Sequence, residues 1–264
     1  MGVLNVTPDS FSDGGEYLDP AVAVERALAM QAEGAAIVDV GGESTRPGAT
    51  PVTVEEELAR VIPVIEALAG QLTIPVSVDT SKPEVMRAAV QAGAGLINDV
   101  RALQLPGALE AARECAVPVC LMHMQGEPGH MQTDPRYADV VTEVLDFLCQ
   151  RVEACEAAGI AREHLLLDPG FGFGKTLAHN LGMLAALERF SGPGLPVLVG
   201  MSRKSMIARV LDRDTGDRVY GSVAAAVLAA SRGARVIRVH DVQATSDALA
   251  VVRAVADATG EKHT

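Results

Sequence analysis

The chain of 264 residues carries a formal net charge of −12 at pH 7, which argues against a nucleic-acid surface because such a surface needs a stripe of basic residues. Aromatic residues make up 3% of the chain and tryptophan is absent, so a base-stacking platform is not expected either. No apolar run approaches the roughly 20 residues that cross a bilayer, and the cysteines show no spacing typical of disulfides or zinc, which together favour a cytoplasmic protein away from membranes.

Short apolar runs alternate with longer, alanine-rich patterns of helical period along the whole chain. The strands expected from this alternation span residues 2–6, 36–41, 74–80, 96–100, 118–124, 164–168, 196–201 and 235–239. The clearest helical patterns span residues 21–33, 54–69, 83–92 and 219–231. Glycine follows several helical patterns, as is common just beyond a helix end, at Gly34, Gly70, Gly93, Gly159 and Gly233.

This alternation of strands and helices predicts a parallel sheet covered by helices. The number of repeats favours an α/β fold of the (β/α)₈ TIM-barrel type, as one domain over residues 1–264. A doubly wound open sheet is the alternative, because strand order cannot be read from a sequence.

A barrel predicts that the chemistry lies at the C-terminal ends of the strands and in the loops that follow them. Polar side chains occur there, at Asn5, Asp39, Asp79, Asn98, His123, Asp168, Lys204, Arg238 and His240. Two of these strand ends carry basic residues, in segments 201–205 and 236–241, against the overall negative charge. The pattern predicts an anion site, and the glycine-containing polar loops 7–15 and 41–48 are typical of loops that cover a substrate.

Seven segments of the chain, in order and without gaps, resemble one family. They are NVTPDSFSDGG (5–15), DVGGESTRPGA (39–49), SVDTSKPEV (77–85), INDVR (97–101), LLLDPGFGFGKT (165–176), GMSRKS (200–205) and IRVHDV (237–242). The family is that of the bacterial dihydropteroate synthases, TIM-barrel transferases of folate synthesis and targets of sulfonamides. The resemblance implies condensation of 6-hydroxymethyl-7,8-dihydropterin pyrophosphate with p-aminobenzoate, release of pyrophosphate, Mg²⁺ as the cofactor, and a homodimer.

The pterin ring requires groups that accept and donate hydrogen bonds at its aminopyrimidine edge, and carboxylates and amides suit this edge. The resemblance implies a pterin site made of Asp79, Asn98, Met122, Asp168 and Lys204. The alternative for Asp79 is that its side chain caps the helix that follows.

Arginine binds phosphate oxygens with a planar fork, and an amide oxygen suits Mg²⁺, which takes few protein ligands beside phosphate. The resemblance implies that the pyrophosphate is bound by Asn5, Thr45, Arg238 and His240, with Asn5 as the Mg²⁺ ligand. Catalytic roles are implied for Asp13, Lys204, Arg238 and His240. The alternatives are that Asn5 is only a turn residue and that the basic pair only bridges an acidic helix start such as Asp241.

The p-aminobenzoate ring requires an apolar slot, and its carboxylate requires hydroxyls or helix N-terminal amides. The resemblance implies a site made of Phe11, Thr45, Arg46, Pro47, Phe173 and Ser205. The alternative is that Phe11 and Phe173 belong to the core. The glycine-rich segment 170–176 has one residue too few for a P-loop, and we interpret it as a loop that shapes the pterin pocket, with His123 behind it.

For the implied reaction we expect an SN1-like displacement, in which pyrophosphate departs first or nearly so and the amine then attacks. Such a reaction needs no strong general base, and the residues contain no set of nucleophile, base and orienting group. The chain begins inside the first expected strand, without the small N-terminal hairpin of the family, and a start codon placed too late is the favoured explanation. Three rivals stay open: a corrinoid-type pterin methyltransferase domain, a non-enzymatic pterin-binding paralogue, and a Schiff-base aldolase that uses Lys204.

Overall fold

Eight parallel strands form the centre of the molecule and follow one another around the sheet in chain order. This computed structural model describes residues 1–7, 20–44, 49–126, 131–212 and 218–259. The strands are β1 (Gly2–Asn5), β2 (Val38–Gly41), β3 (Val76–Asp79), β4 (Leu96–Asp99), β5 (Val119–Met122), β6 (Leu165–Asp168), β7 (Val197–Val199) and β8 (Ala234–Ile237).

The circle of strands is closed by backbone hydrogen bonds between β1 and Val239, two positions beyond the end of β8. The amide of Val3 donates to the carbonyl of Val239 over 3.0 Å, and the amide of Val239 donates to the carbonyl of Met1 over 2.9 Å. Sequential parallel order with closure defines a (β/α)₈ barrel and excludes the doubly wound alternative, whose strand order reverses at a switch point. The predicted TIM barrel is confirmed.

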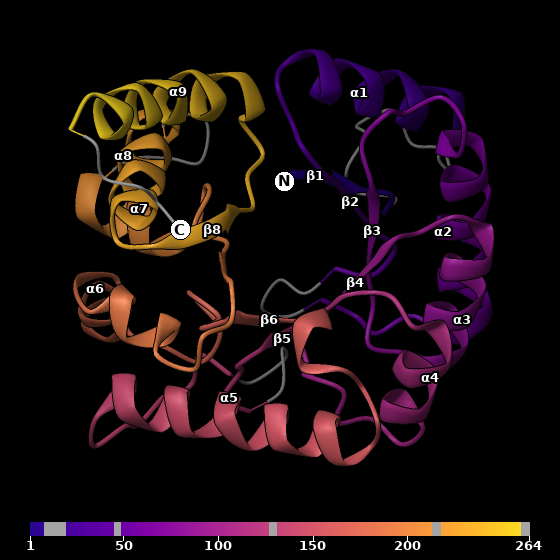
Figure 1. Cartoon of the computed structure of the whole chain (residues 1–264), viewed down its shortest axis with the longest axis horizontal. Helices are drawn as coiled ribbons and strands as arrows, with labels where there is room; N and C mark the ends of the chain where they lie inside the picture. Colours follow the sequence, from indigo (N-terminus) through magenta and orange to yellow (C-terminus); the bar gives the residue numbers. More distant parts are fainter. Residues whose placement is uncertain (8–19, 45–48, 127–130, 213–217, 260–264) are drawn as a thin grey trace.

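Helices surround the strands on all sides (Figure 1). They are α1 (Pro20–Ala32), α2 (Val54–Leu68), α3 (Pro83–Ala92), α4 (Ala108–Cys115), α5 (Val140–Ala157), α6 (Leu177–Ala185), α7 (Ser205–Leu211), α8 (Val219–Ser231) and α9 (Val242–Thr259), with short 3₁₀ turns η2 (Arg162–His164) and η3 (Leu187–Ser191). Within the described part of the chain, no helix is long and apolar enough to cross a membrane.

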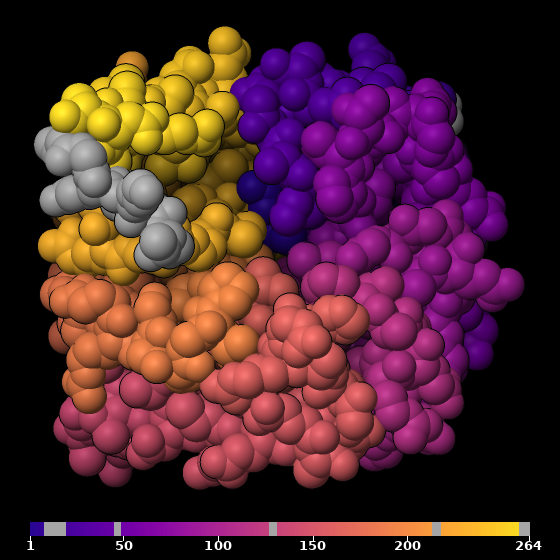
Figure 2. Space-filling view, in the orientation of Figure 1, coloured from indigo at the N-terminus to yellow at the C-terminus, as the bar shows by residue number. Residues whose placement is uncertain are grey.

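The core lies between the strands and the helices. Strand residues such as Val40, Val78 and Leu121 are fully buried and pack in one cluster with helix residues such as Ile65 and Leu148. The first and last helices of the chain lie close together on the surface, where the indigo α1 region lies beside the yellow α9 (Figure 2). Because all strands of the closed barrel run in parallel, their C-terminal ends form one rim, and side chains far apart in the sequence are brought together there.

Candidate active site

An arginine from the residue after β8 and two carboxylates, one within β2 and one at the end of β3, meet inside the rim. The Arg238 Nε atom donates to Asp39 Oδ2 over 2.6 Å, and its Nη2 atom donates to Asp79 Oδ2 over 2.8 Å. Asn98 joins the group, since its Nδ2 atom donates to Asp39 Oδ2 over 3.1 Å. Arginine suits this position because its planar fork can hold two carboxylates at once.

Burial dominates the electrostatics of this cluster. It raises the pKa of Asp79 to about 7, and the nearby Arg238 guanidinium only partly opposes the rise. Asp39 is fully buried, and its Oδ1 atom has no hydrogen-bond partner among the described residues. A buried acceptor without a partner is costly in a stable fold, so this oxygen is suited to a donor group that a ligand supplies.

A lysine and an aspartate occupy the neighbouring part of the rim. Lys204 Nζ donates to the carbonyl of Phe171 over 2.5 Å and lies 4.5 Å from the centre of the Phe173 ring. Asp168 Oδ1 accepts from the amide of Gly170 over 2.7 Å. Burial lowers the pKa of Lys204 to about 8, while the Asp168 carboxylate acts in the opposite direction. This part of the rim offers an ammonium, an aromatic face and a carboxylate to one ligand.

The imidazole of His240 is held by a hydroxyl from the neighbouring strand end. Ser202 Oγ lies 3.1 Å from both the backbone nitrogen and the Nδ1 atom of His240. Arg203, next in the chain, forms an ion pair with Asp241, with its Nε atom 3.0 Å from Oδ2. The structure therefore assigns the bridge to Asp241 to Arg203, whereas Arg238 faces the carboxylates of the rim.

Comparison with known proteins matches this arrangement to one group of enzymes. A family described as pterin binding enzyme matches residues 1–240. The dihydropteroate synthase of Escherichia coli K12 is 57% identical over 99% of this chain and 93% of its own length. The Yersinia pestis dihydropteroate synthase, solved with a sulfonamide drug, superposes with a TM-score of 0.93 at 55% identity, over 97% of this chain and 93% of that one.

A further structure, the Xanthomonas albilineans dihydropteroate synthase with 4-aminobenzoic acid, has a TM-score of 0.91 at 58% identity and covers 96% of this chain and 91% of that one. The chain belongs to the dihydropteroate synthase family. The family resemblance predicted from the sequence is thereby confirmed.

The fold brings together most of the described residues that the family resemblance implies for the pterin. Asp79 and Asn98 lie in the arginine cluster, and the Lys204 charge acts on the Asp168 carboxylate. Met122 is buried in a small cluster with Phe173, outside the main core. The capping alternative for Asp79 is wrong, because the residue at the N-cap of α3 is Lys82 and it makes no side-chain cap.

The two described residues that are implied for p-aminobenzoate differ in burial. Phe173 is nearly buried and faces Lys204, whereas Ser205 is exposed at the first position of α7. Five implied residues lie outside the described part of the chain: Phe11, Asp13, Thr45, Arg46 and Pro47.

The end of β1 suits a magnesium ion shared with a substrate. A side-chain carbon built on Gly41 would lie 3.6 Å from Asn5 Oδ1 and 3.8 Å from Asp79 Oδ2, so an amide oxygen and a carboxylate border the same space. Within the described ranges, no group of three or more histidine, cysteine or acidic side chains gathers around a point. One or two oxygen ligands fit Mg²⁺, which completes its shell with water and substrate phosphates.

Sequence reasoning assigns no role to three residues that contact the site. Asp39 is one of several polar strand ends, Ser202 one of two hydroxyls in the basic loop, and Lys175 part of a glycine-rich segment. The signal for Asp39 is a carboxylate in the middle of an apolar strand, where a charge needs a partner. No sequence signal places Ser202 next to His240, because that contact depends on β7 and the segment after β8 lying side by side.

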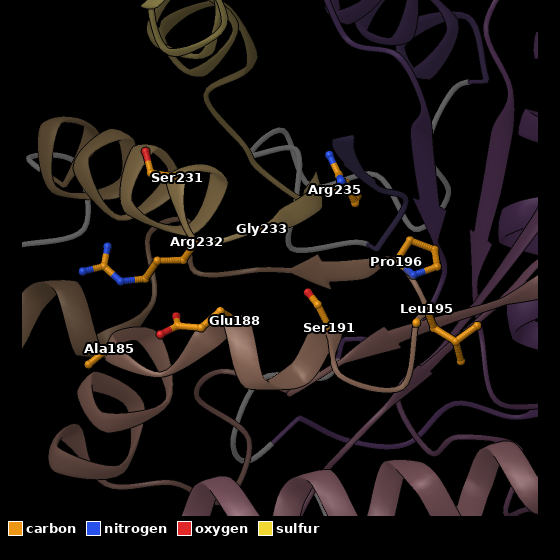
Figure 3. A pocket seen from close by; sticks show the side chains of 10 residues that line it. Ala185, Glu188, Ser191, Leu195, Pro196, Ser231, Arg232, Gly233 and Arg235 are labelled. Atoms are coloured by element: carbon orange, nitrogen blue, oxygen red, sulfur yellow. The ribbon is translucent and has the colours of Figure 1, made fainter. Parts of the chain in front are cut away.

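An open hollow of about 950 Å³ lies near the starts of β7 and β8, at the opposite end of the strands (Figure 3). Glu188 and Ser191 of η3 line it together with Pro196, Arg232 and Arg235. None of the residues implied for substrate binding borders it, as expected for the face of a barrel that concerns stability.

Proposed function

We propose that this chain condenses 6-hydroxymethyl-7,8-dihydropterin pyrophosphate with p-aminobenzoate to form 7,8-dihydropteroate, and that residues 1–264 act as one catalytic domain. The observation that carries the proposal is the presence of two polar groups on the rim. In the first, Arg238 donates to Asp39 and Asp79, and Asn98 donates to Asp39. In the second, the charges of Asp168 and Lys204 interact. The first set offers acceptors for an aminopyrimidine edge, and the second offers a cation for a ring carbonyl.

In this proposal the pterin ring binds to Asp79, Asn98 and Asp168, with Lys204 at the ring carbonyl and Met122 against the ring face. The pyrophosphate lies toward Arg238 and His240. Arg238 uses its Nε and Nη2 atoms for the two carboxylates, and a guanidinium has further N–H groups to offer a phosphate. The ring of p-aminobenzoate packs beside Phe173, with Phe11, Thr45, Arg46, Pro47 and Ser205 as the other residues of its site.

The reaction breaks the bond between the pterin methylene carbon and the pyrophosphate oxygen, and the electron pair leaves with the oxygen. The amine nitrogen of p-aminobenzoate then bonds to this carbon and loses a proton. Arg238 and His240 stabilise the charge that develops on the departing oxygen, and the rest of the site holds the two substrates in line. Asp13 is assigned to the same step, in the first substrate-covering loop.

Asn5 is the residue assigned to Mg²⁺, which would neutralise part of the pyrophosphate charge when bound. Cytoplasmic localisation is proposed from the four cysteines, none of which is paired. We also propose a homodimer, supported by exposed apolar side chains on adjacent α7 and α8, where Val210 is 57% and Tyr220 is 88% exposed. Light scattering at twice the 27.5 kDa chain mass is the expected result.

The test is release of pyrophosphate by the purified protein, with each substrate and Mg²⁺ omitted in turn. We expect release only with all three, and Asn5→Ala should raise the Mg²⁺ concentration for half-maximal rate about tenfold. Release without p-aminobenzoate would indicate a hydrolase. Pterin binding without release would indicate a binding paralogue, and inactivation by borohydride in the presence of a carbonyl substrate would favour the aldolase rival.

A further inference from the structure

Lys175 is a buried lysine for which the proposed reaction has no use. Its side chain is 2% exposed, and its Nζ atom lies 2.9 Å from the carbonyl oxygens of Gly170 and Phe173 and 2.9 Å from His123 Nδ1. An ammonium has three donors, so these partners match its capacity. Burial lowers the pKa of Lys175 well below its usual range, and burial together with the Lys175 charge lowers the pKa of His123 to about 3.

The turn of residues 170–174 is folded around this Nζ atom and lies directly on the segment after β5. Gly170 and Gly174 have φ values of 69° and 61°, and a side-chain carbon on either would collide with the carbonyl oxygen of His123 or of Gln125. Only glycine adopts this backbone at such close approach. The turn thus directs two of its carbonyls inward, where Lys175 binds both.

The outer side of the same turn determines where the Lys204 amine lies. The carbonyl of Phe171 accepts from Lys204 Nζ over 2.5 Å, and the ring of Phe173 lies under it. Between them, a side-chain carbon built on Gly172 would be 3.1 Å from Lys204 Cδ, and the Gly172 amide donates to Asn180 Oδ1 over 2.7 Å. Lys204 therefore packs along a backbone surface whose shape depends on what fills the turn.

We propose that Lys175 is a positioning residue, which holds the 170–174 turn in the shape that places the Lys204 amine in the pterin site. This inference rests on the role proposed for Lys204. The Asp168 carboxylate interacts with both lysines, because its negative charge favours the protonated form of each. Removal of Lys175 leaves two carbonyls without their donor, so the turn relaxes and Lys204 moves. A displacement of about 1 Å in such a site can reduce a rate about 10²-fold.

The experiment is a double-mutant cycle on kcat/KM for the dihydropterin pyrophosphate, with Lys175→Met, Lys204→Met and the double variant. Lys175→Met alone should reduce kcat/KM about 10- to 100-fold. In the Lys204→Met background it should reduce kcat/KM no more than about twofold, because the residue through which it acts is already gone. A role in stability alone predicts equal reductions in both backgrounds, and that result would overturn the proposal.

Arg151→Met is the matched control. Arg151 also donates to two turn carbonyls, those of Ala102 and Leu103, but this turn makes none of the described contacts with Lys204. The control should lower the melting temperature and leave kcat/KM within about twofold of the parent. An equal loss of kcat/KM in the control would overturn the proposal.

Two further outcomes distinguish failure of the inference about Lys175 from failure of the role proposed for Lys204. If Lys204→Met is fully active, the role proposed for Lys204 fails and the inference fails with it. If Lys204→Met is impaired, but the double variant loses kcat/KM by the product of the two single reductions, the two residues act independently and only the inference about Lys175 fails. If Lys175→Met does not fold, Asn180→Ala tests the same turn from its other side, since it removes the acceptor of the Gly172 amide. A smaller reduction of kcat/KM is expected, and again only when Lys204 is present.

Discussion

The two halves of the rim hold their charges in different ways. At β2, β3 and β8, one cation lies between two carboxylates, with Arg238 bound to Asp39 and Asp79. At β6 and β7, the lysines are held by backbone carbonyls, since Lys204 donates to Phe171 and Lys175 to Gly170 and Phe173. The first half fixes its side chains by opposite charge, and the second by neutral dipoles that leave the Lys204 charge available to a ligand.

The first half contains a second cation that lies between two carboxylates. Lys82 Nζ lies 2.8 Å from Glu43 Oε2 and 2.5 Å from Glu57 Oε2, so a cation again lies between two carboxylates. Glu43 also accepts from the amide of Val52 over 3.1 Å, which links the described residues on either side of positions 45–48. Loss of one cation in this half should therefore leave carboxylates buried and unpaired, whereas loss of a lysine in the other half leaves Asp168 its hydrogen bond from the Gly170 amide.

Arg238→Ala should have the largest effect. From the sequence alone, this change is expected to reduce turnover and leave folding intact, but the buried pair with Asp39 changes the second expectation. We now expect kcat/KM to fall about 10²- to 10³-fold and the free energy of unfolding to fall by about 3–5 kcal/mol, because Asp39 stays buried without its partner. Urea denaturation and steady-state kinetics measure the two effects.

Arg203→Ala is the control for stability. Its ion pair with Asp241 leaves 41% of the arginine side chain exposed, so the loss in unfolding free energy should be at most about 1 kcal/mol. Equal stability of Arg238→Ala and the parent would contradict the view that charge pairing fixes this half of the rim.

Lys82→Met should have the next largest effect, and on stability. We expect a loss of about 3 kcal/mol in the free energy of unfolding, because Glu57 is fully buried, and Glu57→Gln in the same background should restore at least half of it. Burial raises the pKa of Glu57, so without Lys82 the folded state retains the proton at higher pH than the unfolded state. The loss should therefore be smaller at pH 5 than at pH 8.

Arg87→Met serves as the comparison for this prediction, because Arg87 and its partner Glu114 are both exposed. No measurable change in urea denaturation is expected for it. If adding Glu57→Gln to Lys82→Met leaves the free energy of unfolding unchanged, the buried carboxylate does not need its cation and the prediction is wrong.

The pH profile should show the smallest effect, and it compares the two halves in one experiment. Asp79, with a pKa of about 7, must be ionised to accept hydrogen bonds, and Lys204, with a pKa of about 8, must be protonated to donate them. The value of kcat/KM should fall about tenfold per pH unit below pH 7 and above pH 8. Lys204→Arg should move the upper limit to higher pH and leave the lower one, whereas a shift of both limits would contradict the assignment.

The strands and several helices can be predicted because their patterns are strong and local. Helices 83–92 and 219–231 have the bounds predicted for them, and the expected strands contain the observed ones except β8, which begins one residue early at Ala234. Several strands end earlier than predicted, since residues such as Thr80 and Met201 are apolar or β-branched in sequence but lie beyond the last residue of the ladder. Helix α7 is not among the predicted helices, because seven residues after a basic loop carry too little periodicity.

The site is predictable as far as one rule applies, that chemistry lies at the strand ends of a barrel. This rule identifies Asp79, Asn98, Asp168 and Arg238 but not which charges pair. The bond from Arg238 to Asp39 joins residues 199 positions apart, and such partners depend on strand order and side-chain direction. The role of Lys175 cannot be predicted from the sequence, because it binds backbone carbonyls, which every residue has.

The closure of the barrel gives the site a place in the order of folding. The hydrogen bonds that join Val239 to Met1 and Val3 connect the first strand to the segment after the last strand, and contacts so distant in sequence carry a large entropic cost and form slowly. Arg238 lies next to this seam and its carboxylate partners belong to β2 and β3, so the Arg238 hydrogen bonds join the same distant parts of the chain. A chain whose helices had formed but whose barrel had not closed would therefore lack the Arg238 pairs with Asp39 and Asp79, and its site would be incomplete.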